Sequence, residues 1–383
     1  MRSYKNSGVS RRKFLQDIGL ASLSIPLIPA IGNCNNGTKQ NPQTMNERNK
    51  KAGKLGIALV GLGGYAGGQL APALQHTEHC YLAGIVTGTP SKIPVWQEKY
   101  NIADKNIYNY QNYDSIKDNP DIDIIYVVLP NSMHAEYSIR AAAANKHVIC
   151  EKPMAITVKE CDEMIAASKK AGKMLSIGYR LHFDPYNLEM ARLGRENIFG
   201  KIKSMTAGFS FVAQKGIWRL DKRLAGGGPL MDLGIYCLQG VCYTTGMEPL
   251  AVTAQSMPVS DKEKFIDIEE TLSWQMEMPG GVVADCRSSY SESKNLLRAD
   301  AENGWFELSP AYSYENLKGR TSEGIMNFPK ISQQAKQMDG FALAIKNKKA
   351  SIVPGEMGRR DMKIVEAIYE AMHTGKRIEI AKD

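Results

Sequence analysis

The chain of 383 residues is long enough for two domains, each with its own hydrophobic core. Its hydrophobic content of 43% and charged content of 23% are ordinary for a soluble globular protein. The net charge of +8 is modest and comes without an aromatic-interleaved basic motif, so we do not expect a nucleic-acid partner. The seven cysteines form no C-x-x-C pair and have no paired histidine spacing, so we expect no metal site.

The first 52 residues are interpreted as an export signal followed by a polar leader. The adjacent pair Arg11 and Arg12 precedes a mildly apolar stretch at 18–31, and a polar stretch rich in asparagine follows at 33–49. This order is typical of an export signal, and the arginine pair before Phe-Leu resembles the twin-arginine type. Because the apolar stretch is too short to span a bilayer, we expect a periplasmic protein without membrane insertion. A disordered basic tail is the alternative.

Short apolar runs alternate with helical patterns from residue 53 to residue 177. Strands are expected at 55–60, 81–86, 123–129, 147–150 and 174–177, and helices at 65–75, 92–100, 134–145 and 158–171. This alternation predicts a Rossmann domain, in which a doubly wound parallel sheet is covered by helices. Thr157, with Glu160 three residues later, predicts the cap at the start of the last helix.

The pattern changes in the second domain, which we place at 178–383. Segments of β-rich composition lie at 201–212, 250–257, 266–278, 281–290 and 296–308. They predict an open, mostly antiparallel sheet with a hairpin at 279–281. Helices are expected near 230–245, 333–347 and 358–374. The fold class is therefore α/β followed by α+β, and we expect a homo-oligomer, dimer or tetramer, that assembles through the open sheet.

A dinucleotide fingerprint of the form G-x-G-x-x-A follows the first strand directly and ends at Ala66. In such a turn the first glycine permits the sharp bend and the second lets the pyrophosphate approach the backbone. The helix that follows supplies N–H groups to the phosphates. An ordinary glycine-rich turn is the alternative. The residues that we expect to line the cofactor here are Gly61, Leu62, Gly63, Gly64 and Tyr65.

The residues after the second strand determine whether NAD or NADP binds, and an NAD site usually has an acidic residue there that binds the ribose 2′-hydroxyl. The segment 87–92 has no acid but three hydroxyl residues and Lys92. Hydroxyls, led by Thr87, and an ammonium suit a 2′-phosphate, so we expect NADP rather than NAD. A helix start capped by serine or threonine is the alternative interpretation, and both can hold.

Two further strand ends are expected to reach the same crevice. Leu129 ends the third strand, and Pro130, Asn131 and His134 follow it, where they would lie beside the ribose or the nicotinamide. An ordinary loop with a proline stop is the alternative. Lys152, in the run Glu151-Lys152-Pro153, follows the fourth strand. A lysine in a partly buried cleft can take or relay the proton of a hydroxyl that loses hydride. A surface lysine is the alternative, and the sequence does not settle whether the Lys152–Pro153 bond is cis.

Asp232 and Tyr236 follow the turn Gly226–Pro229. Because they are four residues apart, they share one face of a helix. That face would present a carboxylate and a phenol to one substrate, with Asp232 holding Lys152 charged and oriented. The alternative has Asp232 stabilising the first helical turn and Tyr236 in the core.

Together these clusters resemble the glucose–fructose oxidoreductase, inositol dehydrogenase and rhizopine-catabolism family, known as Gfo/Idh/MocA, from about Leu55 to the end of the chain. The resemblance is strongest to its periplasmic glucose–fructose oxidoreductase branch. The matching segments are Gly61–Gly63, Leu129–Ser132, Cys150–Met154, Ile177–Arg180, Trp218–Leu220 and Gly226–Tyr236.

The resemblance implies catalytic positions for Lys152, Asp232 and Tyr236, and a position proposed for proton transfer for Tyr179. Most relatives carry histidine where this chain has Tyr236. The resemblance also implies cofactor contacts at Thr87, Lys92, Tyr110, Glu151, Arg180, Trp218 and Arg219. The polar leader has no clear match to the arm that the periplasmic branch wraps over its cofactor, so permanent retention of NADP stays open.

The expected function is transfer of hydride from a cyclic sugar hydroxyl to NADP. If the cofactor stays bound, a second sugar must reoxidise it. The first alternative is a sugar or polyol dehydrogenase that releases NAD or NADP. A second is a redox-neutral, NAD-dependent glycoside hydrolase, and a third is a cofactor-bound sensor without turnover.

Overall fold

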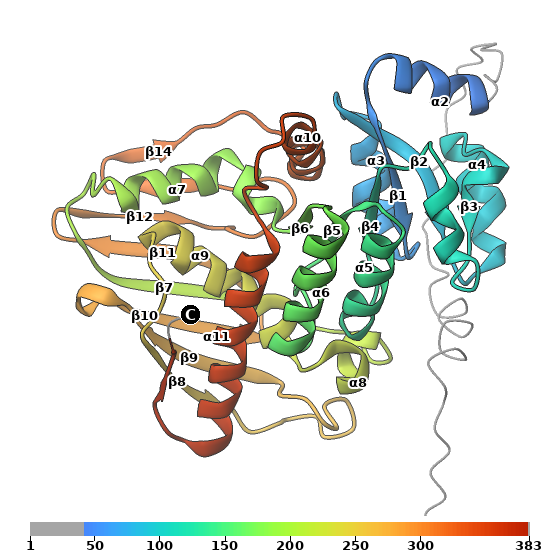
Figure 1. Cartoon of the computed structure of the whole chain (residues 1–383). Helices are drawn as coiled ribbons and strands as arrows, with labels where there is room; N and C mark the ends of the chain where they lie inside the picture. Colours follow the sequence, from blue (N-terminus) through green and yellow to red (C-terminus); the bar gives the residue numbers. More distant parts are fainter. Residues whose placement is uncertain (1–41, 382–383) are drawn as a thin grey trace, which may run out of the picture.

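Figure 1 shows a computed structural model of the chain, in which residues 42–381 are described. The predicted twin-arginine signal lies outside these residues. The end of the predicted leader forms helix α2 (Pro42–Lys51), which packs on the first domain. There, Asn46 Nδ2 donates to Asp121 Oδ2 at 3.3 Å. No helix in the described range is long and apolar enough to cross a membrane.

The first domain is built on a six-stranded parallel sheet in the order β3-β2-β1-β4-β5-β6. Its strands are β1 (Leu55–Val60), β2 (Cys80–Val86), β3 (Ile107–Tyr108), β4 (Ile124–Val127), β5 (His147–Cys150) and β6 (Leu175–Ile177). The predicted Rossmann sheet is confirmed. β3 was not predicted, because two residues are too few to show a periodic pattern. The strand order reverses between β1 and β4, which opens a crevice at the carboxyl ends of the strands.

Helices cover both faces of this sheet. They are η2 (Ala66–Leu70), α3 (Ala71–Leu74), α4 (Ile93–Tyr100), α5 (His134–Ala143) and α6 (Val158–Ala171), with short 3₁₀ turns η3 (Pro90–Lys92), η4 (Asp104–Asn106), η5 (Tyr113–Asp118) and η6 (Asn131–Met133). The predicted cap of α6 is present, since Thr157 Oγ1 accepts the N–H of Glu160 at 3.2 Å. The helix after the fingerprint begins with a π-helical turn, η2, instead of a regular α-helical one.

The second domain contains a nine-stranded sheet in the order β14-β13-β12-β11-β7-β10-β9-β8-β15. Its strands are β7 (Ile202–Ser210), β8 (Ala251–Ser256), β9 (Thr271–Glu277), β10 (Val283–Ser289), β11 (Lys294–Ala301), β12 (Gly304–Leu308), β13 (Gly319–Thr321), β14 (Gly324–Met326) and β15 (Ile378–Glu379). Neighbouring strands are antiparallel except β7 and β10, which run parallel. The mostly antiparallel sheet is therefore confirmed. The hairpin between β9 and β10 turns through η10 (Pro279–Gly281).

One face of the large sheet is covered by helices α7 (Pro185–Arg195), α9 (Ile235–Thr245) and α11 (Gly355–Thr374). Figure 1 shows α11 lying across the strands, between the sheet and α6 of the first domain. Shorter turns connect them to the cleft: η7 (Arg180–Phe183), η8 (Trp218–Leu220), α8 (Lys222–Ala225) and η9 (Leu230–Gly234). The active-site segments therefore lie where the helical layer meets the Rossmann domain.

The other face of the sheet carries polar side chains that pair with one another. Arg298 forms ion pairs with Asp300 at 2.6 Å and Glu307 at 3.0 Å, and its guanidinium lies 4.4 Å from the centre of the Trp305 ring. Leu297 and its neighbours on alternate positions point the opposite way, into the core. The expected assembly through this open face stays a prediction.

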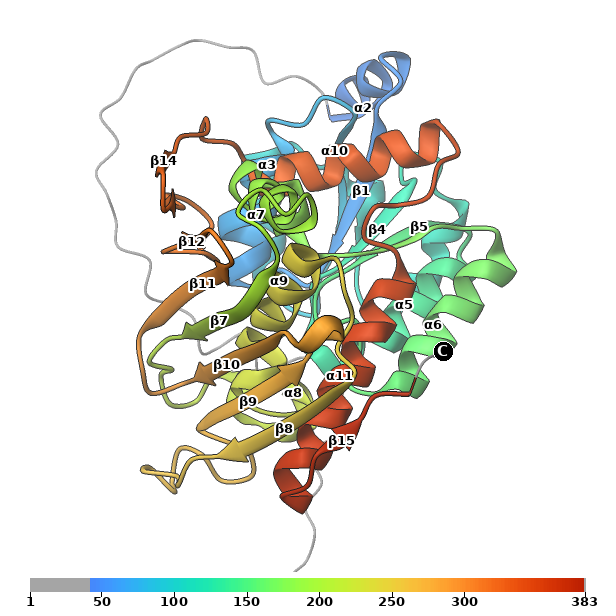
Figure 2. The same ribbon diagram turned by 90° about the vertical axis from the view of Figure 1, so that its left-hand side faces the viewer.

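Helix α10 (Gln333–Lys346) departs from the simple division into two consecutive domains. It falls in the predicted second domain, but Met338 and Phe341 pack into the core of the Rossmann domain. The Asp339 carboxylate accepts the backbone N–H groups of Glu78 at 2.9 Å and His79 at 2.7 Å, just before β2. Figure 2 shows α10 lying beside α3 of the first domain. The chain thus returns to complete its first domain.

A histidine joins two of the strands that lead to the crevice. His147 begins β5, and its Nδ1 accepts the N–H of Met174, which precedes β6, at 3.0 Å. Burial, with a smaller contribution from Lys173, lowers the pKa of His147 to about 4. The neutral ring is therefore the form that the folded protein holds.

Acidification should weaken the fold through this residue. Because the folded pKa lies below the ordinary value of 6.5, the stabilisation is complete above that value and is lost as the pH falls towards 4. We expect the free energy of unfolding, measured by denaturant titration, to fall across this window. It should fall less steeply in His147→Gln, which has no titrating ring. Equal slopes for the two proteins would contradict this role.

Candidate active site

The fingerprint turn after β1 leaves room for a ligand on one side only. Gly61 has φ +94°, and a Cβ there would lie 2.4 Å from the carbonyl oxygen of Val128, at the end of the neighbouring strand. A Cβ at Gly63 or Gly64 would meet no atom within 4 Å. The backbone is thus tightly packed behind the turn and open in front of it. Open space above exposed N–H groups at a helix start fits the pyrophosphate of a dinucleotide.

Lys152 reaches across from the first domain to the second. It follows β5, next to a cis bond to Pro153. Its Nζ donates to Oδ1 of Asp232 at 3.1 Å and to the backbone carbonyl of Asp232 at 2.7 Å. Only 10% of the Lys152 side chain and 14% of the Asp232 side chain are exposed. The lysine is therefore held by two acceptors on one residue, in a site largely shielded from water.

Asp232 is the centre of a larger charge cluster. Besides Lys152, Nε of Arg219 lies 2.9 Å from Oδ2, and the hydroxyl of Tyr290 donates to the same oxygen at 3.2 Å. Burial acts to raise the pKa of Asp232, but Arg219 and Lys152 outweigh it and hold that pKa below its ordinary value. The carboxylate therefore stays ionised through the neutral range, with two cations against it.

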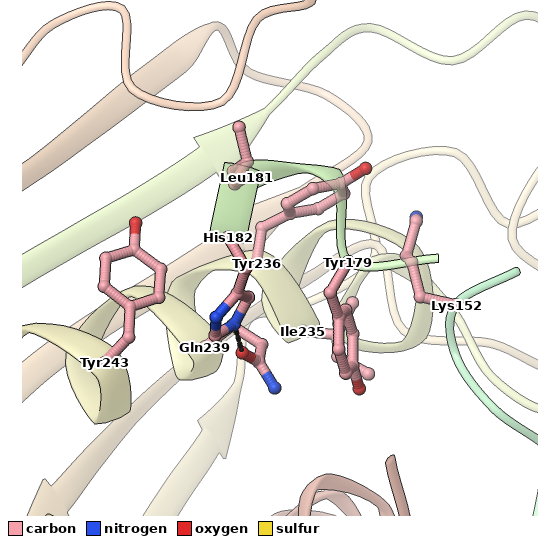
Figure 3. A pocket seen from close by; sticks show the side chains of 8 residues that line it. All are labelled: Lys152, Tyr179, Leu181, His182, Ile235, Tyr236, Gln239 and Tyr243. Carbon is pink, nitrogen blue, oxygen red and sulfur yellow. Dashed lines mark hydrogen bonds between the residues drawn. The ribbon is translucent and has the colours of Figure 1, made fainter. Parts of the chain in front are cut away.

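Tyr236 lies over the lysine from the start of α9. The Lys152 Nζ is 4.6 Å from the centre of its ring, and the Arg180 guanidinium is 5.3 Å from the same centre. Figure 3 shows the Lys152 amine and the Tyr236 hydroxyl pointing to the same side of the site. An ammonium and a phenol that face one direction can both bind one substrate oxygen or two neighbouring ones.

A small cavity of about 10 Å³ lies behind these groups, lined by Lys152, Tyr179, Leu181, His182, Ile235, Tyr236, Gln239 and Tyr243. It has room for about one water molecule and not for a sugar. A substrate must therefore bind on the outer side, where the Lys152 amine and the Tyr236 hydroxyl point.

Tyr179 is buried away from that side. Its hydroxyl makes no hydrogen bond within the described part of the chain, and it points away from the Lys152 amine in Figure 3. Burial and the nearby Asp361 carboxylate raise its pKa well above the ordinary value. The structure thus brings Lys152, Asp232 and Tyr236 together but does not bring the Tyr179 hydroxyl to them.

The two residues expected to select NADP lie beside the fingerprint turn. Lys92 Nζ donates to the carbonyl oxygen of Leu62 at 2.9 Å, and burial lowers its pKa. Thr87 is buried at the end of β2, where its hydroxyl accepts the N–H of Thr89 at 3.1 Å. Tyr110 is half-buried, with its ring against that of Tyr137 at 5.3 Å between ring centres. An ammonium next to the turn fits a 2′-phosphate.

Two other side chains that were expected to contact the cofactor, those of Asn131 and His134, bind groups of the protein itself. Asn131 donates its amide to the carbonyl of Ala225 in the second domain at 2.8 Å. The two ring nitrogens of His134 lie 2.8 Å from the carbonyl oxygens of Leu129 and Pro153. These side chains hold the loops in place.

Arg180 is likewise engaged inside the protein. Its guanidinium donates to the carbonyls of Tyr312 and Ser313 and to the side chain of Gln333. Its Nε is buried without a partner among the described residues. It packs flat against Tyr314, 4.4 Å from the ring centre. The three hydrogen bonds tie Arg180 to the loop after β12 and to the first residue of α10.

The remaining residues that were expected to contact the cofactor are Glu151, Trp218, Arg219 and Tyr65. Glu151 is buried and accepts the hydroxyl of Tyr126 at 2.6 Å, and burial raises its pKa. Trp218 is half-buried under the guanidinium of Arg219, 4.7 Å from its ring centre. Tyr65 packs against Tyr314 with ring centres 5.7 Å apart. Side chains from both domains therefore meet over the fingerprint turn.

Sequence reasoning missed two residues of this site. Tyr290, at the end of β10, donates to Asp232, and Tyr314, in the loop after β12, lies against Arg180 and Tyr65. Neither stands in a motif, because each is brought here by the second sheet and its loops. The pattern Ser288-Ser289-Tyr290 at a strand end was the one local signal.

No cluster of three or more histidine, cysteine, aspartate or glutamate side chains within residues 42–381 could hold a metal ion. The chemistry available is that of a lysine–aspartate pair, a phenol and a dinucleotide turn. A fold and site of this kind define a nicotinamide-dependent oxidoreductase.

Comparison with known proteins gives the family. Residues 55–179 match the oxidoreductase family with an NAD-binding Rossmann fold, Gfo/Idh/MocA, and residues 187–307 match the C-terminal domain of that family. A solved structure of the aldose-aldose oxidoreductase from Caulobacter crescentus, complexed with glycerol, is 40% identical with a TM-score of 0.83. That match covers 85% of this chain and 99% of the other. The chain therefore belongs to the Gfo/Idh/MocA oxidoreductase family.

Curated relatives agree in kind. The D-xylose 1-dehydrogenase [NADP(+)] of Haloarcula marismortui is 26% identical, over 85% of this chain and 92% of its own length. The D-glucoside 3-dehydrogenase of Escherichia coli is 24% identical, over 85% of this chain and 97% of its own length. The prediction of an oxidoreductase of this family is confirmed.

Proposed function

We propose that this protein oxidises a hydroxyl of a cyclic sugar by transferring hydride to NADP. The observation that carries the proposal is the Lys152–Asp232 pair, buried at the end of β5 and facing the crevice of a dinucleotide fold. Support for a sugar as substrate comes from the relatives, whose names describe dehydrogenases and oxidoreductases of aldoses and glycosides.

Lys152 binds the substrate oxygen in this proposal. An ammonium has three N–H groups, and two of them are donated to Asp232, so one is left for a sugar hydroxyl. The Tyr236 hydroxyl points to the same side and binds the same or a neighbouring oxygen. Asp232 keeps the lysine oriented. Once Lys152 has released one proton to water, its amine keeps two N–H groups for Asp232 and has a lone pair that takes the proton of the hydroxyl as the hydride leaves, which restores the ammonium. When bound, NADP supplies the atom that accepts the hydride.

Lys92, Thr87 and the absence of an acid in the segment 87–92 support NADP over NAD. The D-xylose dehydrogenase of Haloarcula marismortui is named for the same cofactor. We further propose that the cofactor stays bound and is reoxidised by a second sugar, as in an oxidoreductase that couples two sugars. The competing candidate is a dehydrogenase that releases NADP after each turnover, which the relatives named as dehydrogenases favour.

The absorbance spectrum of the purified protein separates these two functions. After gel filtration, a coupled enzyme should carry NADP, show the band of reduced nicotinamide when glucose is added, and lose that band when fructose follows. If the purified protein carries no cofactor and reduces added NADP steadily, it is a dehydrogenase that releases its cofactor, and the coupling of two sugars is excluded. No reduction by any aldose, with or without added NADP, would overturn sugar oxidation itself.

Lys152→Met should lower turnover by roughly 10²–10⁴-fold, the range of a lost general acid–base group. NADP binding should change little, because Lys152 bonds to Asp232 and not to the fingerprint turn. Lys159→Met is a matched control, since that side chain is 86% exposed on α6. A Lys152 variant that retains more than about a tenth of the wild-type rate would remove this residue from the role.

Lys92→Ala should weaken NADP by about tenfold or more, as the loss of one hydrogen bond to a charged group predicts, and NAD far less. The reason is that only NADP offers a 2′-phosphate to this ammonium. Titration of each cofactor by protein fluorescence measures both affinities. Lys99→Ala, on the exposed side of α4, is the control. Equal losses for the two cofactors would mean that Lys92 does not read the 2′-phosphate.

We also propose that the protein reaches the periplasm by the twin-arginine route, on the evidence of Arg11 and Arg12 before the apolar stretch. That route moves folded proteins, so NADP can be loaded in the cytoplasm. Changing both arginines to lysine should hold active, cofactor-loaded protein in the cytoplasm, as cell fractionation and activity assays would show. Export of the double variant at the wild-type level would argue against this route.

A further inference from the structure

We propose that Glu269 is a positioning residue for the active site: its buried carboxylate fixes the turn that carries Asp232 and thereby places both acceptors of Lys152. This inference rests on the proposed function, in which Asp232 orients Lys152. Glu269 lies just before β9, in the second domain, and has no place in any of the motifs that point to the cofactor or the substrate.

The carboxylate binds the start of the turn directly. Oε2 of Glu269 accepts the N–H of Gly228 at 3.0 Å, and Oε1 accepts the N–H of Leu230 at 3.2 Å. Leu230 stands two residues before Asp232, in the first position of η9. N–H groups at the start of a helix have no partner within the helix, so a side-chain acceptor decides how that end is held.

A tyrosine from the last long helix completes this contact. Tyr369, on α11, donates its hydroxyl to Oε1 of Glu269 at 2.9 Å. A Cβ at Gly227 would lie 2.0 Å from that hydroxyl oxygen, and one at Gly228 would lie 2.5 Å from the carbonyl oxygen of Glu269. The consecutive glycines of the turn thus leave space for the phenol and for the strand that brings the carboxylate.

Hydrogen bonds, without an ion pair, stabilise the carboxylate of Glu269 among the described residues. The side chain is 8% exposed, and within residues 42–381 no ion pair joins it to a lysine or an arginine. Burial raises its pKa, while its N–H and O–H donors favour the ionised form. A buried carboxylate that accepts three hydrogen bonds binds its donors more strongly than a neutral group does. The turn is therefore tied to a rigid strand and to α11.

The position of this turn matters because Lys152 makes two hydrogen bonds to it. Lys152 Nζ donates to the carboxylate of Asp232 and also to its backbone carbonyl. If the turn moves, both acceptors move together, and the lysine loses its orientation even though every catalytic side chain is still present. Displacement of a catalytic group by about 1 Å can cost about 10²-fold in rate.

Glu270 provides a matched control in the next position. It is 4% exposed, and its carboxylate also accepts a backbone N–H and a hydroxyl, those of Ser260, each at 2.6 Å. Its partners belong to the loop before β9 and not to the turn that carries Asp232. Glu269→Gln and Glu270→Gln therefore each remove one buried carboxylate from neighbouring residues. Only Glu269→Gln changes a contact with the turn that carries Asp232.

The first experiment measures the lysine without relying on activity. Purified protein is labelled briefly with acetic anhydride, and the rate at Lys152 is measured by mass spectrometry against the exposed Lys159. In Glu269→Gln the Lys152 rate should rise by about tenfold, the factor that losing one hydrogen bond to a charged group carries. In Glu270→Gln it should stay at the wild-type value. An unchanged Lys152 rate in a folded Glu269→Gln protein would overturn the proposal.

The second experiment tests whether Glu269 acts through Asp232. Glu269→Gln should lower kcat by roughly 10–100-fold, with little change in the sugar KM or in NADP affinity. In an Asp232→Asn background the same change should cost less than about twofold, because the residue that it positions is already impaired. Equal costs in both backgrounds would mean a general structural effect and would overturn the proposal.

Tyr369→Phe keeps the Glu269 carboxylate and removes one of its three hydrogen-bond donors. It is the variant to test if Glu269→Gln does not fold. It should raise the Lys152 labelling rate in the same direction by a smaller factor, and no rise would count against the proposal. Failure of this positioning role and failure of the proposed function give different results. If labelling responds but wild-type protein transfers no hydride from any sugar, the proposed function fails and the positioning of Lys152 stands.

Discussion

The ion pair between Lys152 and Asp232 joins the two domains at the point where chemistry is expected. The lysine comes from the end of a parallel strand, and the aspartate comes from a π-helical turn that leads into a helix on the other sheet. Neither domain contains the pair by itself. Two cations and one phenol share the carboxylate of Asp232, and the two cations keep it ionised. Cations in a site that is largely shielded from water stabilise an oxygen that loses its proton.

Many polar groups near the crevice hold the protein together instead of facing a ligand. Asn131 bonds to the backbone of the second domain, His134 lies between the carbonyls of two loops, and Arg180 binds the loop after β12. A sequence motif shows that such residues belong near the cofactor. It does not show whether a side chain binds the cofactor or holds the loop that does. Motif membership and ligand contact are separate properties.

The sequence predicts the parts of this protein whose signals are local. The fingerprint at Gly61 and Gly63, the cap at Thr157 and the strand before Lys152 each depend on neighbouring residues, and all were found. β3, β13, β14 and β15 were missed because each has only two or three residues and, unlike the equally short β6, none stands out in a regular alternation of strands and helices. Tyr290 and Tyr314 were missed because strands and loops distant in sequence bring them to the site. The return of α10 to the first domain has the same origin.

That return of α10 affects the order in which the molecule can be completed. The Rossmann domain begins at β1, but part of its core, with Met338 and Phe341, and the carboxylate that caps the backbone before β2 belong to a helix near the end of the chain. During synthesis the nucleotide-binding half leaves the ribosome well before this helix does. Its apolar surface must stay uncovered until almost the whole polypeptide has been made. A nascent chain of this protein therefore has a long interval in which its first domain is present but unfinished, and premature termination anywhere before residue 333 would leave that domain without its last layer.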